Sequence, residues 1–237
     1  MTLLTLGTDG LTSSAARLVH TALRRRDRDR RVGRTLWWKR LLDVLLGTPL
    51  LLISLPLLAC LALAVVLDSR GPAFFNQERV GWRGRAFRMW KLRTMHADCD
   101  QTLHRHTAAS WFAARPHGDF YKTLADPRIT RVGRFLRRTN LDELPQLFNV
   151  VRGEMSLVGP RPAIPYELAH YRPAYFQRLE VPPGMTGLWQ VTRRDRLSAG
   201  EMMQLDLRYV REASPGQDLR ILLMTIPALL ASAAQGT

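Results

Sequence analysis

The stretch TNLDELPQLFNVVRGEMSLVGPRP, Thr139–Pro162, holds the features from which our interpretation of the fold starts. Its apolar residues recur at helical spacing, and Pro145, which lacks a backbone N–H, is tolerated only in the first turn of a helix. The sequence therefore predicts a helix whose N-terminal cap lies near Asp142. The adjacent carboxylates of Asp142 and Glu143 would then lie at the positive end of the helix dipole, which favours their ionised form.

This acidic pair follows four arginines that lie close together in the sequence. An ionised carboxylate beside guanidinium groups is a suitable nucleophile or metal ligand for a phosphate. A simpler interpretation is that Asp142 only caps the helix and that Glu143 only complements its dipole. The arginines themselves are of a kind that often forms a solvated helix face. They are Arg131, Arg134, Arg137 and Arg138.

The composition indicates a basic chain that is long enough for one domain with a sizeable core. It has 237 residues and a formal net charge of +15 at pH 7, from 35 lysines and arginines against 20 acidic residues. Such an excess favours nucleic acid, anionic lipid or a phosphorylated substrate as a partner. Cys60 lies in an apolar tract, so we expect no disulfide with Cys99, and no Cys/His spacing matches a zinc site.

Residues 36–68 include an apolar tract, Val44–Leu67, that holds no charged side chain. At ~1.5 Å per residue a helix over this tract is about 36 Å long, more than the ~30 Å hydrocarbon core of a bilayer. Pro56 near its middle must kink the helix, and both flanks are basic, whereas a spanning helix is expected to have unequal flanks. From these features alone, a kinked spanning helix and a re-entrant helix fit equally well.

Local sequence patterns predict the structure of the segments before and after this tract. Residues 1–35 have the composition of a basic tail, whose arginine-rich part would attract anionic membrane lipids. Residues 73–93 alternate apolar and polar side chains between glycines. This pattern predicts a short β-hairpin with Lys91 and Arg93 at its end.

Three helices and two loops rich in glycine and proline are expected in the remainder. Thr130 would cap a short helix, a second helix spans 199–212, and an apolar helix over 218–231 is too short to cross a bilayer and suits the membrane interface. The apolar face of the first helix is expected to hold Val132, Phe135 and Leu136. The loop that begins at 181 would run into a strand-like piece that ends at 191.

The other loop, Gly159–Pro162, is a rigid turn that carries one arginine. Turn chemistry explains its glycine and prolines but not Arg161. A phosphate is a natural partner for this guanidinium group, which can bind it in a bidentate manner.

Taken in order, these motifs resemble the bacterial sugar transferase family, the monotopic polyprenol-phosphate phosphoglycosyl transferases that begin glycan assembly. The resemblance covers about residues 36–230, and the ordered set of motifs is far more specific than any single one. The motifs are KRLLD (Lys39–Asp43), QERVG (Gln77–Gly81), KLRTM (Lys91–Met95), LDELPQL (Leu141–Leu147), GPRP (Gly159–Pro162), PGMTGL (Pro183–Leu188) and LD (Leu205–Asp206).

The resemblance implies an enzyme of the bacterial inner (cytoplasmic) membrane. It would move a sugar-1-phosphate from a UDP-sugar to undecaprenyl phosphate and release UMP. The implied fold is mainly α with a small β-hairpin: a re-entrant, proline-kinked membrane helix over 36–68, and a compact catalytic domain over 69–237 on the cytoplasmic face, with interfacial amphipathic helices. We also expect the chain to lack the extra membrane-spanning region that larger members carry before the catalytic part.

The same resemblance assigns the site. It implies that Asp142 is the nucleophile that takes up the phosphosugar and a ligand of Mg²⁺, and that Glu143 completes the catalytic pair. A carboxylate that attacks a diphosphate is an anion meeting an anion, so the site needs cations to neutralise it. The basic residues expected to bind the substrate phosphates are Lys91, Arg93, Arg161 and Arg194.

The sequence departs from the family pattern at the kink, where members usually carry a Ser-Pro pair. Here Leu55 precedes Pro56, and either Ser54 or a neighbouring helix becomes the candidate donor to the backbone carbonyl that the proline leaves unpaired. Asp218 also matches a polar position of the family pattern, with no role that the sequence supplies.

Two alternatives come from other functional classes. A membrane-anchored nucleic-acid-binding protein should interleave basic and exposed aromatic residues along one face, whereas here the basic residues cluster near carboxylates and glycine turns, so no nucleic acid is expected. A family-like scaffold without catalysis is disfavoured by the intact Asp142–Glu143 pair. No motif identifies the sugar, the pathway or the oligomeric state.

Overall fold

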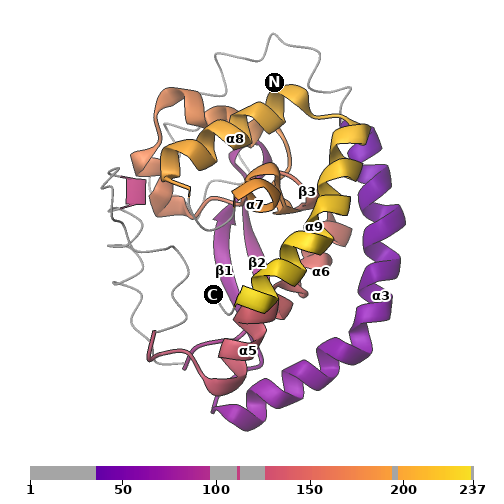
Figure 1. Cartoon of the computed structure of the whole chain (residues 1–237), viewed down its shortest axis with the longest axis vertical. Helices are drawn as coiled ribbons and strands as arrows, with labels where there is room; N and C mark the ends of the chain where they lie inside the picture. Colours follow the sequence, from indigo (N-terminus) through magenta and orange to yellow (C-terminus); the bar gives the residue numbers. More distant parts are fainter. Residues whose placement is uncertain (1–35, 97–110, 113–125, 194–196, 236–237) are drawn as a thin grey trace, which may run out of the picture.

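The computed structural model describes most of the chain, and the fold below refers to that part. Figure 1 shows a two-stranded hairpin at the centre, shorter helices packed around it and one long helix along the outside. The predicted tail over 1–35 lies outside the described residues. The residues that the structure describes are 36–96, 111–112, 126–193 and 197–235.

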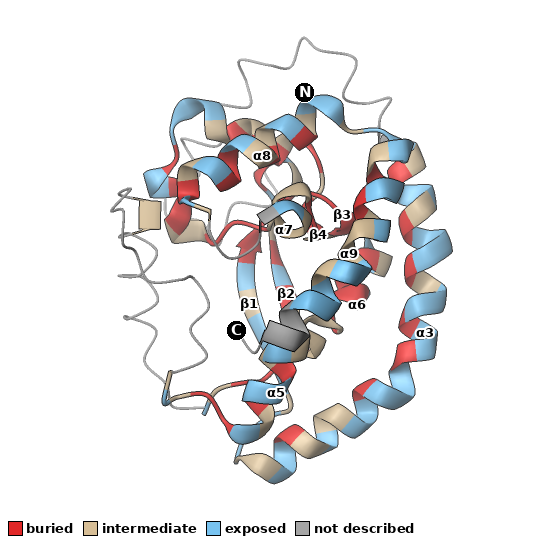
Figure 2. Cartoon of the chain, viewed as in Figure 1, coloured by how far each residue is buried: buried red, intermediate tan, exposed pale blue. Residues whose placement is uncertain are grey.

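The long helix, α3, covers Leu36–Asp68 and contains Pro49 and Pro56. Among the described residues it is the one helix that is long and apolar enough to cross a membrane. Only 22% of its most apolar stretch of 18 residues is buried inside the protein. Figure 2 shows exposed residues along most of the length of the helix. In Figure 1 it runs down one side of the molecule and then turns beneath the rest. Because many large apolar side chains of α3 are exposed, its outer face is suited to contact with an apolar environment such as lipid.

Ser54 does not fill the role expected of it beside Pro56. The proline has no N–H for the carbonyl of Leu52, four residues before it. The Ser54 hydroxyl donates instead to the carbonyl of Leu51, at 2.8 Å. The carbonyl that the proline leaves unpaired is thus not the one that this serine satisfies.

The predicted hairpin is confirmed. β1, Phe74–Val80, pairs antiparallel with β2, Ala86–Leu92. The turn between them, which includes the short 3₁₀ helix η1, Trp82–Gly84, has positive φ values, 55° at Arg83 and 75° at Gly84. Lys91 therefore lies near the end of β2, as expected.

The first predicted helix is also confirmed, as α5, Arg131–Thr139. Thr130 Oγ1 accepts from a backbone N–H of the first turn at 3.0 Å. Leu136 is fully buried, but Phe135, expected on the same apolar face, is 53% exposed. The helix ends at Asn140, whose φ of 57° is one that asparagine tolerates, and there the chain turns toward the acidic pair.

The helix expected to begin at the acidic pair begins later. Leu141–Glu143 forms a 3₁₀ turn, η2, and the α-helix α6 covers Gln146–Arg152 with Pro145 as its N-cap. Pro145 has no N–H for the carbonyl of Leu141, so that carbonyl accepts from Leu144, three residues on, at 3.3 Å. The prediction that the pair caps the helix is therefore wrong.

The two glycine-rich loops pack against each other. β3, Ser156–Val158, pairs in parallel with β4, Gly184–Thr186. A Cβ atom on Gly184 would lie 2.0 Å from the backbone N of Gly159, a distance that no side chain tolerates. Close backbone approach therefore explains both glycines better than turn conformation does.

Three helices complete the described fold. The predicted helix over 199–212 is confirmed as α8, Ala199–Glu212, and the apolar C-terminal helix is α9, Pro215–Gln235. The strand-like piece expected to end at 191 is instead largely the short helix α7, Leu188–Arg193. Leu188 and Val191 lie three residues apart, and both pack on the same buried cluster, which requires helical spacing.

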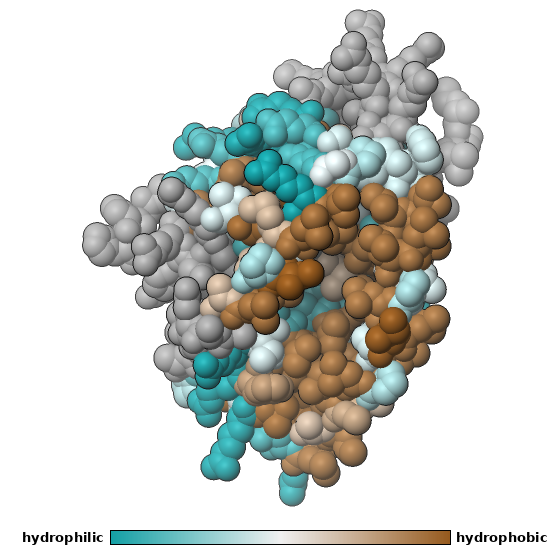
Figure 3. Space-filling view, turned by 45° about the vertical axis from the view of Figure 1, so that its right-hand side comes forward, coloured by the Kyte–Doolittle hydropathy of each residue, from teal (hydrophilic) through white to brown (hydrophobic). Residues whose placement is uncertain are grey.

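The exposed apolar residues of α3 and α9 gather on one face of the molecule, shown in brown in Figure 3. The other side of both helices packs on the core, through residues such as Leu51 and Ile221. Two 3₁₀ segments, η3 (Pro165–His170) and η4 (Pro173–Glu180), pack beside α8 and β1. The exposed set includes Leu45, Leu52, Ile53, Leu63 and Leu67 of α3, and Leu219, Leu223, Ile226 and Leu230 of α9.

Candidate active site

Strand β2 and the turn η2 bring three of the predicted site residues together. Lys91 Nζ donates to Glu143 Oε1 at 3.0 Å and lies 4.0 Å from Asp142 Oδ2. Asp142 is only 3% exposed, and its Oδ1 is buried with no hydrogen-bond partner in the described part of the chain. An unsatisfied buried oxygen costs free energy unless a ligand meets it. Lys91 thus binds Glu143 directly and lies near Asp142, which keeps one oxygen for a ligand.

Arg137 is a second cation near this pair, although no local pattern distinguishes it from the three other arginines of α5. Its Nε donates to Thr94 Oγ1 at 2.9 Å, just past the end of β2. Burial lowers the pKa of the Arg137 guanidinium, and the carboxylates of Asp142 and Asp126 oppose that shift. The three other arginines of α5 are exposed, as expected of a solvated face.

Arg93 has a different environment from the one expected of a phosphate ligand. Its guanidinium donates to the carbonyls of Ser69, Arg70 and Pro72 at 2.7–2.8 Å, and to the Ser69 hydroxyl at 2.8 Å. Longer contacts reach the carbonyls of Val65 and Gly71. The side chain therefore mainly holds the loop that directly follows α3, residues 69–72, and reaches one carbonyl of the last turn of the helix. None of these contacts is with Asp142 or Glu143.

Arg161 points its guanidinium at the fully buried Glu167, with the closest N–O distance 3.1 Å. Burial by itself would raise the pKa of the Glu167 carboxyl, but Arg161 and Arg79 outweigh it and hold that pKa at about 2. The structure thus places Arg161 in an ion pair with Glu167, and this contact does not involve the acidic pair.

The turn that carries Arg161 lies on further buried charges. Arg178 donates to the backbone carbonyl of Arg161 at 2.8 Å and to Asp206 Oδ2 at 2.5 Å. Arg79 donates to the carbonyl of Pro162 at 2.9 Å. Burial raises the pKa of Asp206 to about 6, although Arg178 and Arg161 act in the opposite direction. Three guanidinium groups therefore face two carboxylates beneath this turn.

Arg194 lies outside the described residues, so its expected role stays a prediction.

Asp218, for which the sequence supplied no role, has a clear one. Its Oδ2 accepts from the buried Lys39 Nζ at 2.6 Å, and its Oδ1 accepts from Tyr209 at 2.6 Å. Asp43, in the same KRLLD motif as Lys39, accepts from Ser156 and Leu157 of β3. This motif thus docks the start of α3 on the rest of the fold.

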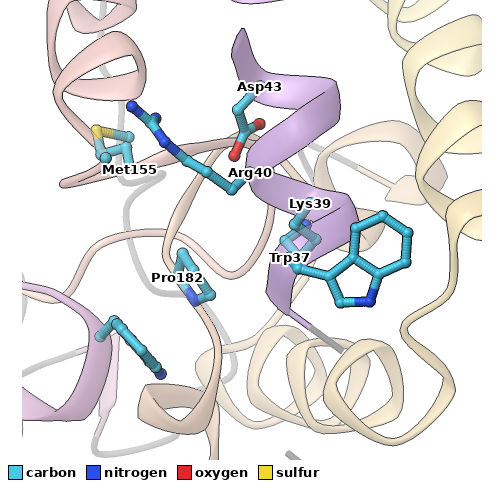
Figure 4. A pocket seen from close by; sticks show the side chains of 8 residues that line it. Trp37, Lys39, Arg40, Asp43, Met155 and Pro182 are labelled. Atoms are coloured by element: carbon cyan, nitrogen blue, oxygen red, sulfur yellow. The ribbon is translucent and has the colours of Figure 1, made fainter. Parts of the chain in front are cut away.

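A cavity of about 310 Å³ opens beside the start of α3, and Figure 4 shows its lining. One of its walls is Arg40, which donates to the carbonyls of Val150 and Val151 near the end of α6. Asp142 and Glu143 precede α6 and do not line the cavity. The lining is Trp37, Lys39, Arg40, Asp43, Trp82, Gly153, Met155 and Pro182.

The acidic pair offers carboxylate oxygens to the expected Mg²⁺. The described residues contain no group of three His, Cys, Asp or Glu side chains that could hold a metal ion. Mg²⁺ at phosphate-transfer sites, however, is typically bound by one or two carboxylates together with substrate phosphates. The unsatisfied Asp142 Oδ1 and the adjacent Glu143 fit that pattern.

Comparison with known proteins identifies similar chains. The family model described as bacterial sugar transferase matches residues 34–232. The exopolysaccharide production protein ExoY of Rhizobium meliloti is 39% identical over 194 residues, which are 82% of this chain and 86% of ExoY. The undecaprenyl-phosphate galactose phosphotransferase of Salmonella typhimurium is 40% identical over 192 residues, 81% of this chain.

A further relative is the galactosyl transferase CpsE of Streptococcus agalactiae, 38% identical over 193 residues, again 81% of this chain. The matched segment makes up 42% of CpsE and 40% of the Salmonella protein. The chain therefore spans about two fifths of the length of these two relatives and most of the length of ExoY.

Proposed function

The chain belongs to the bacterial sugar transferase family, and on this premise we propose that it is a phosphoglycosyl transferase of the bacterial inner membrane. It transfers a sugar-1-phosphate from a UDP-sugar to undecaprenyl phosphate and releases UMP, as the first membrane step of exopolysaccharide, O-antigen or glycan assembly. The name of the Salmonella relative supports undecaprenyl phosphate as the acceptor. The name of ExoY supports exopolysaccharide as the destination.

The environment of Asp142 is the observation that carries this proposal. Its carboxylate is buried, one oxygen has no partner among the described residues, and Lys91 lies 4.0 Å from the other. A carboxylate that attacks a diphosphate meets strong repulsion, which cations held in a site of low dielectric reduce. Lys91 and Arg137 are the described cations that act in this way on Asp142.

The transfer takes two steps. In the first, a carboxylate oxygen of Asp142 attacks the phosphorus that bears the sugar, and the bond from that phosphorus to the bridging oxygen breaks, so UMP leaves with the electron pair. In the second, a phosphate oxygen of undecaprenyl phosphate attacks the same phosphorus, and the carboxylate is released. A covalent intermediate lets two bulky substrates use one pocket in turn.

Glu143 has a supporting part in these steps. Its Oε1 accepts from Lys91 and so keeps the ammonium beside Asp142. When Mg²⁺ is bound, it supplies positive charge at the diphosphate, and Asp142 Oδ1 together with Glu143 would hold it.

The turn Gly159–Pro162 is a second place for a substrate phosphate. The described side chains beneath it include three guanidinium groups, of Arg79, Arg161 and Arg178, and two carboxylates, of Glu167 and Asp206. Among these five groups the positive charges outnumber the negative ones, which favours an anion at this turn. We assign Arg161, with Arg194 from the resemblance, to the nucleotide phosphates.

We also infer a re-entrant arrangement for α3. Its start is attached through Lys39 to Asp218, and the two residues that directly follow its end, Ser69 and Arg70, are held by the Arg93 guanidinium, so both ends are held by the same domain. A helix that crossed the bilayer would need these attachments on opposite membrane faces. Attachment of both ends therefore favours a helix that enters and leaves on the cytoplasmic side, with the apolar face of α3 and α9 in the lipid.

The test is to trap the intermediate. Purified protein is incubated with radiolabelled UDP-sugars, UDP-galactose among them, without acceptor, and intact mass and peptide mapping locate the label. We expect a phosphosugar on Asp142. Asp142→Asn should remove it and lower UMP release by about 10⁴-fold or more, whereas Glu212→Gln, an exposed carboxylate on α8, should change neither.

Two outcomes would contradict the proposal in different ways. An adduct on another residue would refute the nucleophile but keep the reaction class. An absence of adduct and of UMP release with every UDP-sugar, from protein that is folded and bound to membranes, would favour the scaffold without catalysis.

A further inference from the structure

The side chain of Asn149 is fully buried in α6 and connects this helix to the hairpin. Its Nδ2 donates to the carbonyl of Arg88 at 2.8 Å and to Glu154 Oε2 at 2.6 Å. Its Oδ1 accepts from the backbone N–H of Trp90 at 3.1 Å. Both donors and the acceptor of the amide are therefore used, and two of the three partners are backbone groups of β2.

These bonds give β2 a neighbour on the edge that β1 leaves open. β1 pairs with β2 along one edge only, in a sheet of two strands. On the other edge, the Asn149 amide donates to the carbonyl of Arg88 and accepts from the N–H of Trp90, as the N–H and C=O of one residue in a parallel third strand would. A buried strand edge needs such partners, since unpaired backbone groups are costly there.

The position of this contact links it to the acidic pair. Trp90 immediately precedes Lys91, and Asn149 lies on the helix that follows η2. The ion pair of Lys91 with Glu143 is about one-fifth exposed, and partly exposed ion pairs of flexible side chains fix geometry only weakly. The buried amide is the stronger constraint on how β2 lies against the pair.

We propose that Asn149 is a positioning residue for the transfer reaction: its side-chain amide holds β2 on α6 so that Lys91 stays beside Asp142 and Glu143. The inference rests on the proposed function, because it assigns Lys91 a part in the reaction. The place of Lys91 is then set by Asn149, a residue whose side chain is fully buried.

The test variant is Asn149→Asp, which keeps the size of the side chain but replaces the donor with an oxygen. That oxygen would face the carbonyl of Arg88 and the carboxylate of Glu154, so the contact with β2 is lost. Adding Glu154→Gln provides an N–H for the new carboxylate and should restore part of the activity. Asn149→Gln, which keeps the amide on a longer stem, is the second variant if Asn149→Asp does not fold.

The kinetic readout is a double-mutant cycle with Lys91→Met. In the wild-type background this substitution should lower kcat. In the Asn149→Asp background the factor by which Lys91→Met lowers kcat should be at least about five-fold smaller, because Lys91 is already misplaced there. The control is Tyr209→Phe, which removes buried hydrogen bonds to Lys39 and Asp218 but leaves the bonds of Asn149 to β2 in place. In the Tyr209→Phe background, the factor by which Lys91→Met lowers kcat should equal the wild-type factor within about two-fold. Equal effects of Lys91→Met in all three backgrounds would overturn the proposal.

A second readout needs no activity. The chain has only three lysines, Lys39, Lys91 and Lys122, so ¹³C-methylated protein gives at most three lysine signals, and Lys91→Arg assigns one of them. We expect the Lys91 signal to shift in Asn149→Asp and not in Tyr209→Phe. An unshifted signal overturns the positioning role. A shifted signal in a protein without transferase activity would uphold the link to β2 while the proposed function fails.

Discussion

Lys39 and Asp218 are 179 residues apart in the chain, yet Lys39 Nζ lies 2.6 Å from Asp218 Oδ2 and both side chains are buried. The pair joins the first turns of α3 and α9, the two helices whose apolar residues gather on one face (Figure 3). A buried ion pair therefore holds together the starts of the two helices that we place against the membrane.

Removal of one member of this pair should be costly. Lys39→Met leaves the Asp218 carboxylate buried without its cation, and we expect a loss of about 3–5 kcal/mol in the free energy of unfolding, measured by urea titration in detergent. Lys39→Met combined with Asp218→Leu should recover a large part, because no unpaired charge remains. A double variant as unstable as the sum of the single variants would contradict this account.

Lys91 and Arg93 should behave differently, although both were predicted to bind phosphate. Lys91→Met should lower kcat/KM by about 10- to 150-fold, the range of a lost charge-assisted bond of about 1.5–3 kcal/mol, with little change in Tm. Arg93→Met should instead lower Tm, since several carbonyls near the end of α3 lose their donor. UMP release and thermal unfolding, measured on the same preparations, check both. A wild-type Tm together with a large kinetic loss in Arg93→Met would restore Arg93 as a phosphate ligand.

The Arg161–Glu167 pair predicts a specific dependence on pH. The folded pKa of Glu167 is about 2, below its ordinary value of 4.5, so its contribution is present above pH 4.5 and is lost as the pH falls toward 2. Integrated over that window it amounts to about 3 kcal/mol. The pKa of Asp206 is raised to about 6, so its effect has the opposite sign. Its contribution to the free energy of unfolding is present below about pH 4 and is lost as the pH rises to about 6.

The measurement is the difference in free energy of unfolding between the wild type and Glu167→Gln, taken from pH 6 down to pH 3, because Asp206 is present in both proteins. We expect this difference to be constant above about pH 5 and to shrink below it. A difference that does not change with pH would show that Glu167 is not ionised in the folded protein.

The arrangement of α3 can be read by cysteine labelling in intact cells. Both native cysteines are replaced, and single cysteines are introduced as Thr35→Cys and Arg70→Cys; Arg70 is preferable to Ser69, whose hydroxyl accepts from Arg93. A membrane-impermeant thiol reagent should label neither site until the cells are opened. Labelling of one end alone in intact cells would establish a spanning helix and leave the chemistry at Asp142 untouched.

The sequence by itself determined the local elements and the family. The charge-free tract appears as α3, the alternating residues around Arg83 as the hairpin, and the Thr130 cap at the start of α5. Each of these depends on contacts between residues close in the chain, so spacing and composition are enough to predict them. The order of the motifs identified the family in the same way, without any knowledge of how the motifs meet.

Only the tertiary structure decided what each charged side chain does. A guanidinium group looks the same in a sequence whether it meets a phosphate, as expected for Arg93, or the carbonyls near a helix end, as observed. Asp218 had no role until the fold brought Lys39 to it, and Arg137 was one of four similar arginines until the turn at Asn140 brought Asp142 near it. Burial and partners from distant parts of the chain determine these roles, and no local pattern encodes them.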